Sequence, residues 1–307
     1  SLSHLSQMRR LANLLRWRAL IAAHHHDAVT RADAAVTADC IARHLDEGSP
    51  ILLNALVGIA IRGSAINGIT QPMLWPELSA AERAAYVARL APIFEPPPPL
   101  GSALAGEQEL NAWMYASSPS APWRNMPFAA PDRVAGELER CFRPLRELAA
   151  VPVERQCNPD DPLVVRVRGL ENEQVPKLNF PRMFASWIFS GTSRVLTIRV
   201  RLITDQRGAR TVLELFAYRD RTGALPDSLE SLVGDFKIDP FSGKPFIYRR
   251  TDDGFTLYSV GVDRKDNGGR HDPRFGEDRT DSDYVFWPIP DRQATSAPAS
   301  QPDQLPE

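Results

Sequence analysis

The chain has 307 residues, which is enough for two ordinary domains or one large one. Its hydrophobic share of 43% and charged share of 24% are those of a folded protein and exclude a disordered chain. The 36 basic and 38 acidic residues leave a formal net charge of -2, so no global field draws the chain toward nucleic acid or anionic lipid.

The first half of the sequence predicts helices joined as antiparallel hairpins. Leu11, Leu14 and Leu15 recur at helical spacing. Segment 48–76 carries a single charge, Arg62, but the uncharged stretches on either side of it are too short to cross a bilayer, so we expect a buried helix there. Ser79 and Glu82 have the spacing of a capping box and predict the start of the next helix.

A long proline-rich stretch, 92–131, interrupts these helices and is expected to be irregular. It carries Trp113, Tyr115, Trp123 and Phe128, so we expect it to pack on the helices or to bind a partner. A helix is predicted from residue 132 to 149. After it, residues 163–167 alternate in the manner of a short strand.

The last third predicts a long helix followed by a small sheet. The helix begins near Pro181, breaks near Gly191 or Gly208 and stops at Gly223. Strands are expected at 246–249 and 255–260, joined by an Asp-Asp-Gly turn, with a last strand at 283–288. The chain is therefore predicted to be α+β, with an α-helical hairpin domain at 1–178, an α+β module at 179–290 and a disordered tail at 291–307.

An acidic loop lies before the last strand. Gly268 and Gly269 let the chain double back, and oxygen ligands in a flexible loop suit Ca²⁺. The spacing is not that of an EF-hand. The alternative is a solvated loop whose carboxylates are balanced by neighbouring basic residues. The acidic residues fall within 21 positions and are Asp263, Asp266, Asp272, Glu277, Asp278, Asp281 and Asp283.

Four motifs follow one another between Leu202 and Trp287. They are Gly223-Ala224-Leu225-Pro226, the segment from Asp239 to Tyr248 (DPFSGKPFIY), the segment from Tyr258 to Asp263 (YSVGVD), and the acidic glycine-containing loop. In this order they resemble the globular part of the major pseudopilins of type II secretion systems. The resemblance covers somewhat under a third of the chain, and it implies a pilin-like long helix packed on a small antiparallel sheet.

The same resemblance implies a structural Ca²⁺ in the loop. Matching the motif residue by residue, it implies the carboxylates of Asp263, Asp281 and Asp283 as ligands, the carbonyls of Ser259 and Val260, and Asp266 in reserve. Pseudopilins begin with a hydrophobic helix that packs into a filament core and runs straight into the globular part. Here a large helical domain precedes the module, and the segment from Met183 to Leu202 is interrupted by Arg194, Arg199 and Arg201, so pilin-like filaments are not expected. The wider layout resembles uncharacterised envelope proteins of planctomycete-type bacteria.

For function, the sequence contains no G-x-S-x-G, H-E-x-x-H, P-loop or G-x-G-x-x-G motif. The arginine run from Arg194 to Arg210 fits a solvated helix face better than a nucleic-acid stripe. We therefore expect a non-catalytic structural or interaction subunit of a bacterial envelope assembly, periplasmic or otherwise extracytoplasmic. Its partners would be other protein subunits, and an upstream segment would hold any membrane anchor. The alternative is an extracytoplasmic enzyme with its catalytic groups in the helical domain.

Overall fold

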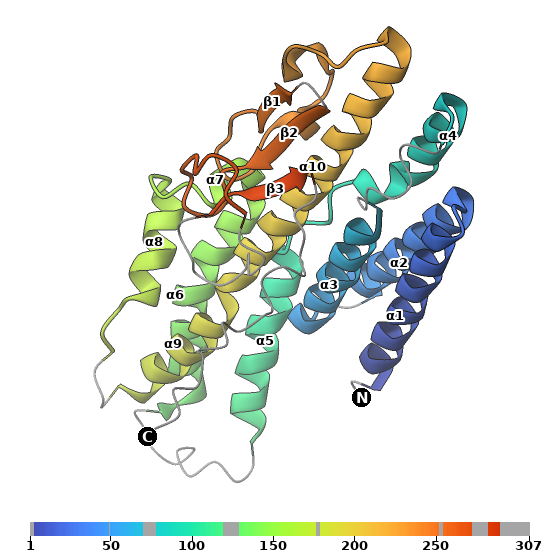
Figure 1. Ribbon diagram of the computed structural model, residues 1–307. Helices are drawn as coiled ribbons and strands as arrows, with labels where there is room; N and C mark the ends of the chain where they lie inside the picture. The colour runs from blue at the N-terminus through green and yellow to red at the C-terminus, as the bar shows by residue number, and fades with distance from the viewer. Residues whose placement is uncertain are drawn as a thin grey trace, which may run out of the picture.

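The protein is described by a computed structural model over residues 3–48, 50–69, 78–118, 129–175, 179–251, 254–271 and 282–288. A first group of helices forms one side of the molecule (Figure 1). Helices α1 (Ser3–His24), α2 (Ala28–Gly48) and α3 (Leu52–Ile69) pack against one another, and α4 (Ala80–Leu90) packs on α2. Ser79 and Glu82 form the predicted capping box at the start of α4, which confirms that helix start.

A second group surrounds α6 (Pro131–Ala150), which contacts α5 (Gly101–Ser117), α8 (Pro162–Glu171) and α9 (Phe180–Thr192). A short α7 (Val153–Gln156) follows α6, and a 3-10 turn, η2 (Ala91–Phe94), precedes α5. Two predictions are wrong here. The stretch expected to be irregular contains α5, and residues 163–167 belong to helix α8 rather than to a strand.

The start of α8 explains the second error. The Asp161 carboxylate accepts a hydrogen bond from the backbone amide of Leu163 at 3.0 Å, and Pro162 occupies the first helical turn. Val164 and Val167 are the buried residues of this helix, and their separation of three positions is a helical spacing. The apolar residues at 163–167 alternate as in a strand, but the capping of this segment by Asp161 favours a helix.

Helix α10 (Arg194–Thr222) is the spine that joins the two groups to the sheet (Figure 1). It follows α9 after a break at Ser193 and ends at Gly223, whose φ of 82° is in the left-handed region that favours glycine. It contacts α3 and α4 on one side and β2 and β3 on the other. The predicted end of this helix at Gly223 is confirmed.

The sheet has three antiparallel strands in the order β1 (Ile247–Thr251), β2 (Gly254–Ser259) and β3 (Tyr284–Trp287). Ile247 pairs with Tyr258, and Tyr258 pairs with Val285 beyond a register shift. Two 3-10 turns, η5 (Leu229–Ser231) and η6 (Asp235–Lys237), connect α10 to the sheet. The predicted hairpin and last strand are confirmed, and the architecture is α+β.

Buried side chains form one cluster from α1 to α4, α10 and the sheet, and another around α5, α6, α8 and α9. Residues of α10 therefore share buried contacts with both helical groups, while the division predicted at residue 178 stays a prediction. All three cysteines are free, so Cys141 and Cys157 are not joined in a disulfide.

Candidate functional site

Asp239 connects two of the sequence motifs at the end of the sheet. Its side chain is buried, and one carboxylate oxygen accepts hydrogen bonds from the Phe241 amide at 3.0 Å and the Ser259 hydroxyl at 2.9 Å. The other oxygen accepts from the Val260 amide at 3.2 Å. Burial raises the pKa of Asp239, and these hydrogen bonds oppose the rise. The DPFSGKPFIY turn is thus fastened to the last residues of β2 through one carboxylate.

Asp283 is the buried carboxylate of the acidic loop. It accepts hydrogen bonds from the backbone amides of Asn267 at 3.2 Å and Gly269 at 2.6 Å, and its own amide donates to the Arg270 carbonyl. Gly268 and Gly269 have φ angles of 74° and 82°, which lets the chain turn back over this carboxylate. Burial raises the pKa of Asp283, and the negative charges of Asp266 and Asp263 add to that rise.

Asp263 and Asp266 lie on the same turn but have different partners. Asp263 accepts from the Lys265 amide at 3.1 Å and from the Asn267 side-chain amide at 3.0 Å. Asp266 accepts from the Tyr258 hydroxyl at 2.8 Å and from the Gly268 amide at 2.9 Å, and it pairs with Arg249 at 3.2 Å. The Gly268 amide and the Tyr258 hydroxyl hold the pKa of Asp266 below its usual value. Asp266 is therefore balanced by a basic residue, as expected for the alternative of a solvated loop without a metal ion.

Three of the predicted carboxylates thus gather around residues 267–269, with Ser259 and Val260 fixed beside them by Asp239. Asp281, together with the loop from 272 to 280, lies outside the described residues. Within the residues described, no group of three His, Cys, Asp or Glu side chains is arranged to hold a metal ion. The calcium site stays a prediction.

The four aromatic residues predicted to bind a partner are not equivalent. The Tyr115 side chain is buried, donates a hydrogen bond to the Ala129 carbonyl at 2.7 Å, and lies with its ring 5.2 Å from that of Phe184. Trp113, two residues earlier on α5, is 65% exposed. Trp123 and Phe128 lie outside the described residues. Tyr115 is therefore used in holding α5 to α9, and Trp113 is available to a partner.

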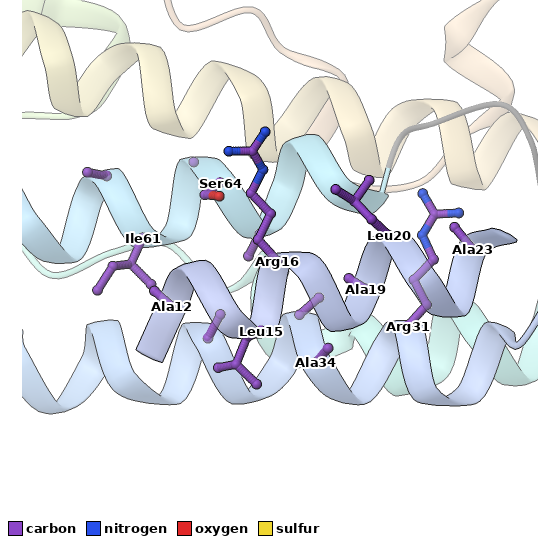
Figure 2. Close-up of a pocket in the computed structure, with 15 residues that line it drawn as sticks. Ala12, Leu15, Arg16, Ala19, Leu20, Ala23, Arg31, Ala34, Ile61 and Ser64 are labelled. Atoms are coloured by element: carbon purple, nitrogen blue, oxygen red, sulfur yellow. The ribbon is translucent and has the colours of Figure 1, made fainter. Parts of the chain in front are cut away.

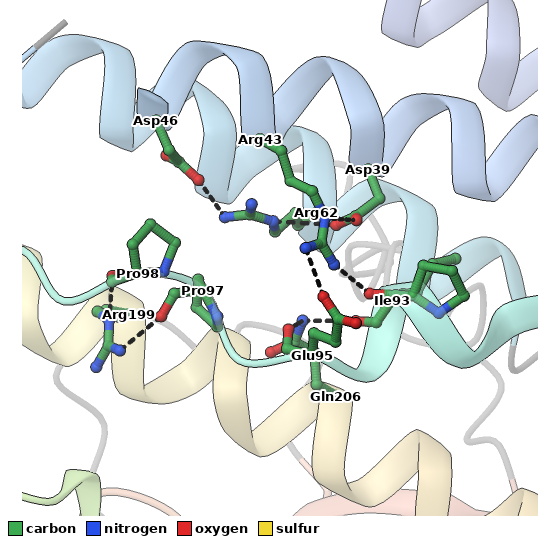
Figure 3. A network of polar contacts seen from close by, with 11 residues as sticks. Asp39, Arg43, Asp46, Arg62, Ile93, Glu95, Pro97, Pro98, Arg199 and Gln206 are labelled. Carbon is green, nitrogen blue, oxygen red and sulfur yellow. Dashed lines mark hydrogen bonds and ion pairs between the residues drawn. The ribbon is translucent and has the colours of Figure 1, made fainter. Parts of the chain in front are cut away.

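A buried polar network fastens the proline-rich segment after α4 to the helices on either side (Figure 3). Arg62 of α3 pairs with Asp39 of α2 at 3.0 Å and also with Asp46, and all three side chains are buried. Arg43 bonds the other Asp39 oxygen at 2.7 Å and reaches Glu95 at 2.6 Å. Burial raises the pKa of Asp46 and the Arg62 charge opposes the rise.

Helix α10 holds the same segment from the opposite side (Figure 3). The Arg199 guanidinium donates to the carbonyls of Pro97 at 2.8 Å and Pro98 at 3.2 Å, and the Gln206 amide donates to the Ile93 carbonyl at 2.8 Å. Burial, together with the nearby Arg62 charge, lowers the pKa of Arg199 to about 10. The prediction that Arg199 belongs to a solvated helix face is wrong, because its side chain is buried and binds two backbone carbonyls.

The first group of helices contains a cavity of about 480 Å³ between α1, α2 and α3 (Figure 2). Its wall is mostly alanine, and the only ionisable side chains among its lining residues are Arg16 and Arg31. A general base, a nucleophile activated by a base, or a carboxylate pair is missing from this lining. The cavity therefore lacks the converging titratable groups that the enzyme alternative requires.

No family model, curated protein or solved structure matches the chain. In the described part of the chain, no helix has the length and apolar character needed to span a bilayer.

Proposed function

We propose that this chain is a non-catalytic structural or interaction subunit of a bacterial envelope assembly that works outside the cytoplasm. The observation that carries the proposal is the bonding of Asp239 to Ser259 and Val260. It links, through one buried carboxylate, two motifs that together resemble those of pseudopilins. Because the two motifs are hydrogen-bonded to each other, and not only consecutive in the sequence, their order is stronger support for a pseudopilin-like module.

The contacts of the buried charged side chains also support a structural role. Arg62, Arg199 and Asp39 bind backbone carbonyls or each other and so fix the position of the proline-rich segment. Buried ionic groups that are fully partnered favour a unique arrangement of the elements they join. Two helical groups held this firmly on one long helix would form a rigid platform for other subunits.

A structural calcium ion is part of the proposal. Asp263 and Asp283 would supply carboxylate oxygens, the carbonyls of Ser259 and Val260 would complete the set, and Asp281 would contribute from outside the described residues. The chemistry of the donors fits, because Asp283 is desolvated and has Asp263 and Asp266 as negative neighbours. A cation would neutralise that repulsion and tie the loop to the end of β2. Asp266, already paired with Arg249, would stay outside the inner set.

The partner would be another protein subunit, and we propose that Trp113 forms part of its binding surface. Met114 beside it is 47% exposed, and Trp187 of α9 is 71% exposed. Exposed tryptophan is costly to leave in water and is enriched among residues that dominate binding energy. Tyr115 and Phe184 pack α5 against α9, the two helices that carry Trp113 and Trp187.

The test is the size of the native complex. Detergent extracts of the native host, run on a blue native gel, should contain the protein in a species larger than the monomer. Trp113→Ala and Trp187→Ala should each return it to monomer size without lowering its melting temperature. Val233→Ala, which removes a 95% exposed apolar side chain from the turn between η5 and η6, should leave the complex intact. A wild-type protein that migrates as a monomer would overturn the proposal.

A further inference from the structure

Helix α1 presents four of its large apolar side chains to solvent, whereas Leu5 is buried and Met8 and Leu15 are half-buried against the core. Leu11, Leu14, Trp17 and Ile21 are 45 to 66% exposed, although they recur every three or four residues and so share one face. The opposite face, which packs on α2 and α3, buries mainly alanine: Ala12, Ala19, Ala22 and Ala23 are 4 to 9% exposed. A helix whose only task was to fill the core would bury the leucines and the tryptophan instead.

The charge of α1 has one sign. It carries Arg9, Arg10, Arg16 and Arg18 and no acidic residue, so its formal charge is +4 with histidine neutral. Because the whole chain carries -2, everything outside α1 carries -6. All four arginines are exposed, and none has an ion pair with a residue that the structure describes. Elsewhere many arginines are paired with carboxylates, for example Arg89 with Asp33.

Helix α1 lies at the edge of the molecule, where its outer face can meet an extended surface (Figure 1). Arg10 and Arg18 belong to the same face as Leu14 and Ile21, since they are four and three residues away from them. Long arginine side chains can bury their stems beside apolar groups while the guanidinium remains at a polar boundary. Tryptophan likewise favours the boundary between water and hydrocarbon.

We infer that the outer face of α1 binds the surface of an anionic phospholipid bilayer, with the helix lying in the plane of the headgroups. The combination of one apolar face, arginine on the same helix and no acidic residue is typical of interfacial helices. A second copy of this chain fits less well, because a two-fold contact through this face would bring the like charges of Arg10 and Arg18 from the two copies close together. The inference does not depend on the calcium site or on the proposed partner surface.

Flotation with lipid vesicles tests the inference on the whole chain. The protein should float with vesicles of 70% phosphatidylcholine and 30% phosphatidylglycerol at 0.1 M salt, and should not float with pure phosphatidylcholine. Binding should weaken at 0.5 M salt, because the attraction is between exposed charges. Arg10→Gln combined with Arg18→Gln should lower the partition coefficient about 25-fold, at roughly fivefold for each arginine.

Variants of exposed residues allow matched controls that should fold normally. Leu14→Gln combined with Ile21→Gln should lower partitioning by about tenfold or more, since it removes the inserted apolar groups. Arg166→Gln with Arg168→Gln, which removes two exposed arginines from α8, should change it by less than about twofold. Trp17 fluorescence should shift to shorter wavelength with anionic vesicles, seen as the difference between wild type and Trp17→Phe.

Three outcomes would overturn the inference. One is a wild-type protein that floats with neither vesicle, and another is flotation unchanged by the α1 variants. The third is self-association in the absence of lipid, measured by sedimentation velocity, that Leu14→Gln with Ile21→Gln abolishes. That last result would assign the face to a second copy of the chain.

Discussion

The ring of Phe286 on β3 occupies the space beside Gly208 on α10, so that a Cβ atom added at Gly208 would lie 2.3 Å from the ring. This contact brings the sheet onto the long helix at the one position where the helix has no side chain. The ring of Phe246, on the segment leading into β1, makes an edge-to-face contact with Phe286, with the two ring centroids 5.2 Å apart. The packing of the sheet on α10 therefore depends on a glycine in the middle of that helix.

Gly208→Ala should destabilise the protein by about 1–3 kcal/mol, because the new methyl group must displace a packed ring. The gain in helix propensity, about 1 kcal/mol, would offset only part of this cost. Gly191→Ala is the matched control, since a Cβ there would meet no atom within 4 Å. Urea unfolding should show that control to be neutral or stabilising. Equal stability for the two variants would contradict the packing described here.

Asp39→Ala should cost about 3 kcal/mol of unfolding free energy, because it removes one of the two carboxylates that pair with the buried Arg62. Arg43 loses a partner too, so the backbone amides of Ile93, Phe94 and Glu95 in the proline-rich segment should exchange faster. Asp33→Ala on the same helix removes a carboxylate from the exposed pair with Arg89 and should cost less than about 1 kcal/mol. A comparison of the two by chemical unfolding checks the claim, and a similar small cost for both would refute it.

Features that depend on residues close together in the sequence were predicted, whereas contacts between residues far apart in the sequence were not. The hairpin of β1 and β2 depends on neighbouring residues and on a turn signal at Gly254, and the end of α10 depends on Gly223 alone; both were predicted. Arg62 stood out in the sequence as the one charge in an apolar segment. Its partner Asp39 is 23 positions away on another helix, so the sequence could not pair them. Arg199 was misread for the same reason, since its acceptors lie about 100 positions earlier.

The acidic loop illustrates a different limit. The resemblance to pseudopilins implied Asp263, Asp281 and Asp283 as calcium ligands with Asp266 in reserve, and that site stays a prediction. In the described residues, Asp263, Asp266 and Asp283 each accept hydrogen bonds from backbone amides of residues 265–269. The sequence could not predict which oxygens would be occupied by backbone amides, because that depends on the left-handed conformations of Gly268 and Gly269. The role of Asp239 was missed, although it stood in a motif, because a lone aspartate before proline is ordinary turn chemistry.

Asp239→Ala should destabilise the protein by about 3–5 kcal/mol, since it leaves the buried amides of Phe241 and Val260 without an acceptor. Asp239→Asn keeps the shape and one acceptor oxygen and should cost about half as much. Asp227→Ala, at a carboxylate that is 98% exposed, should stay within about 0.5 kcal/mol of wild type. Thermal unfolding of the three variants measures this order, and an Asp239→Ala protein as stable as wild type would contradict the account.

The pH dependence of stability should depend on calcium. Burial raises the folded-state pKa of Asp283, so in the presence of a chelator the folded state binds a proton more readily than the unfolded chain. The stability of wild type relative to Asp283→Asn should therefore rise as the pH falls from 7 toward 4.5. Calcium binds the ionised carboxylate, so with saturating calcium the same difference should fall over that range. Urea unfolding at each pH checks this, and identical profiles with and without calcium would count against the site.

The most direct test of the proposed calcium-stabilised module is the melting temperature with millimolar Ca²⁺ and with a chelator. At a calcium concentration 100 times the Kd, an ion that binds only the folded state adds about 2.7 kcal/mol, which corresponds to a rise of about 5 °C. Asp263→Ala should remove most of this rise, whereas Asp272→Ala, outside the matched motif, should keep it. A wild-type melting curve that neither calcium nor the chelator moves would contradict the proposal and leave pairing with basic residues as the source of the loop's stability.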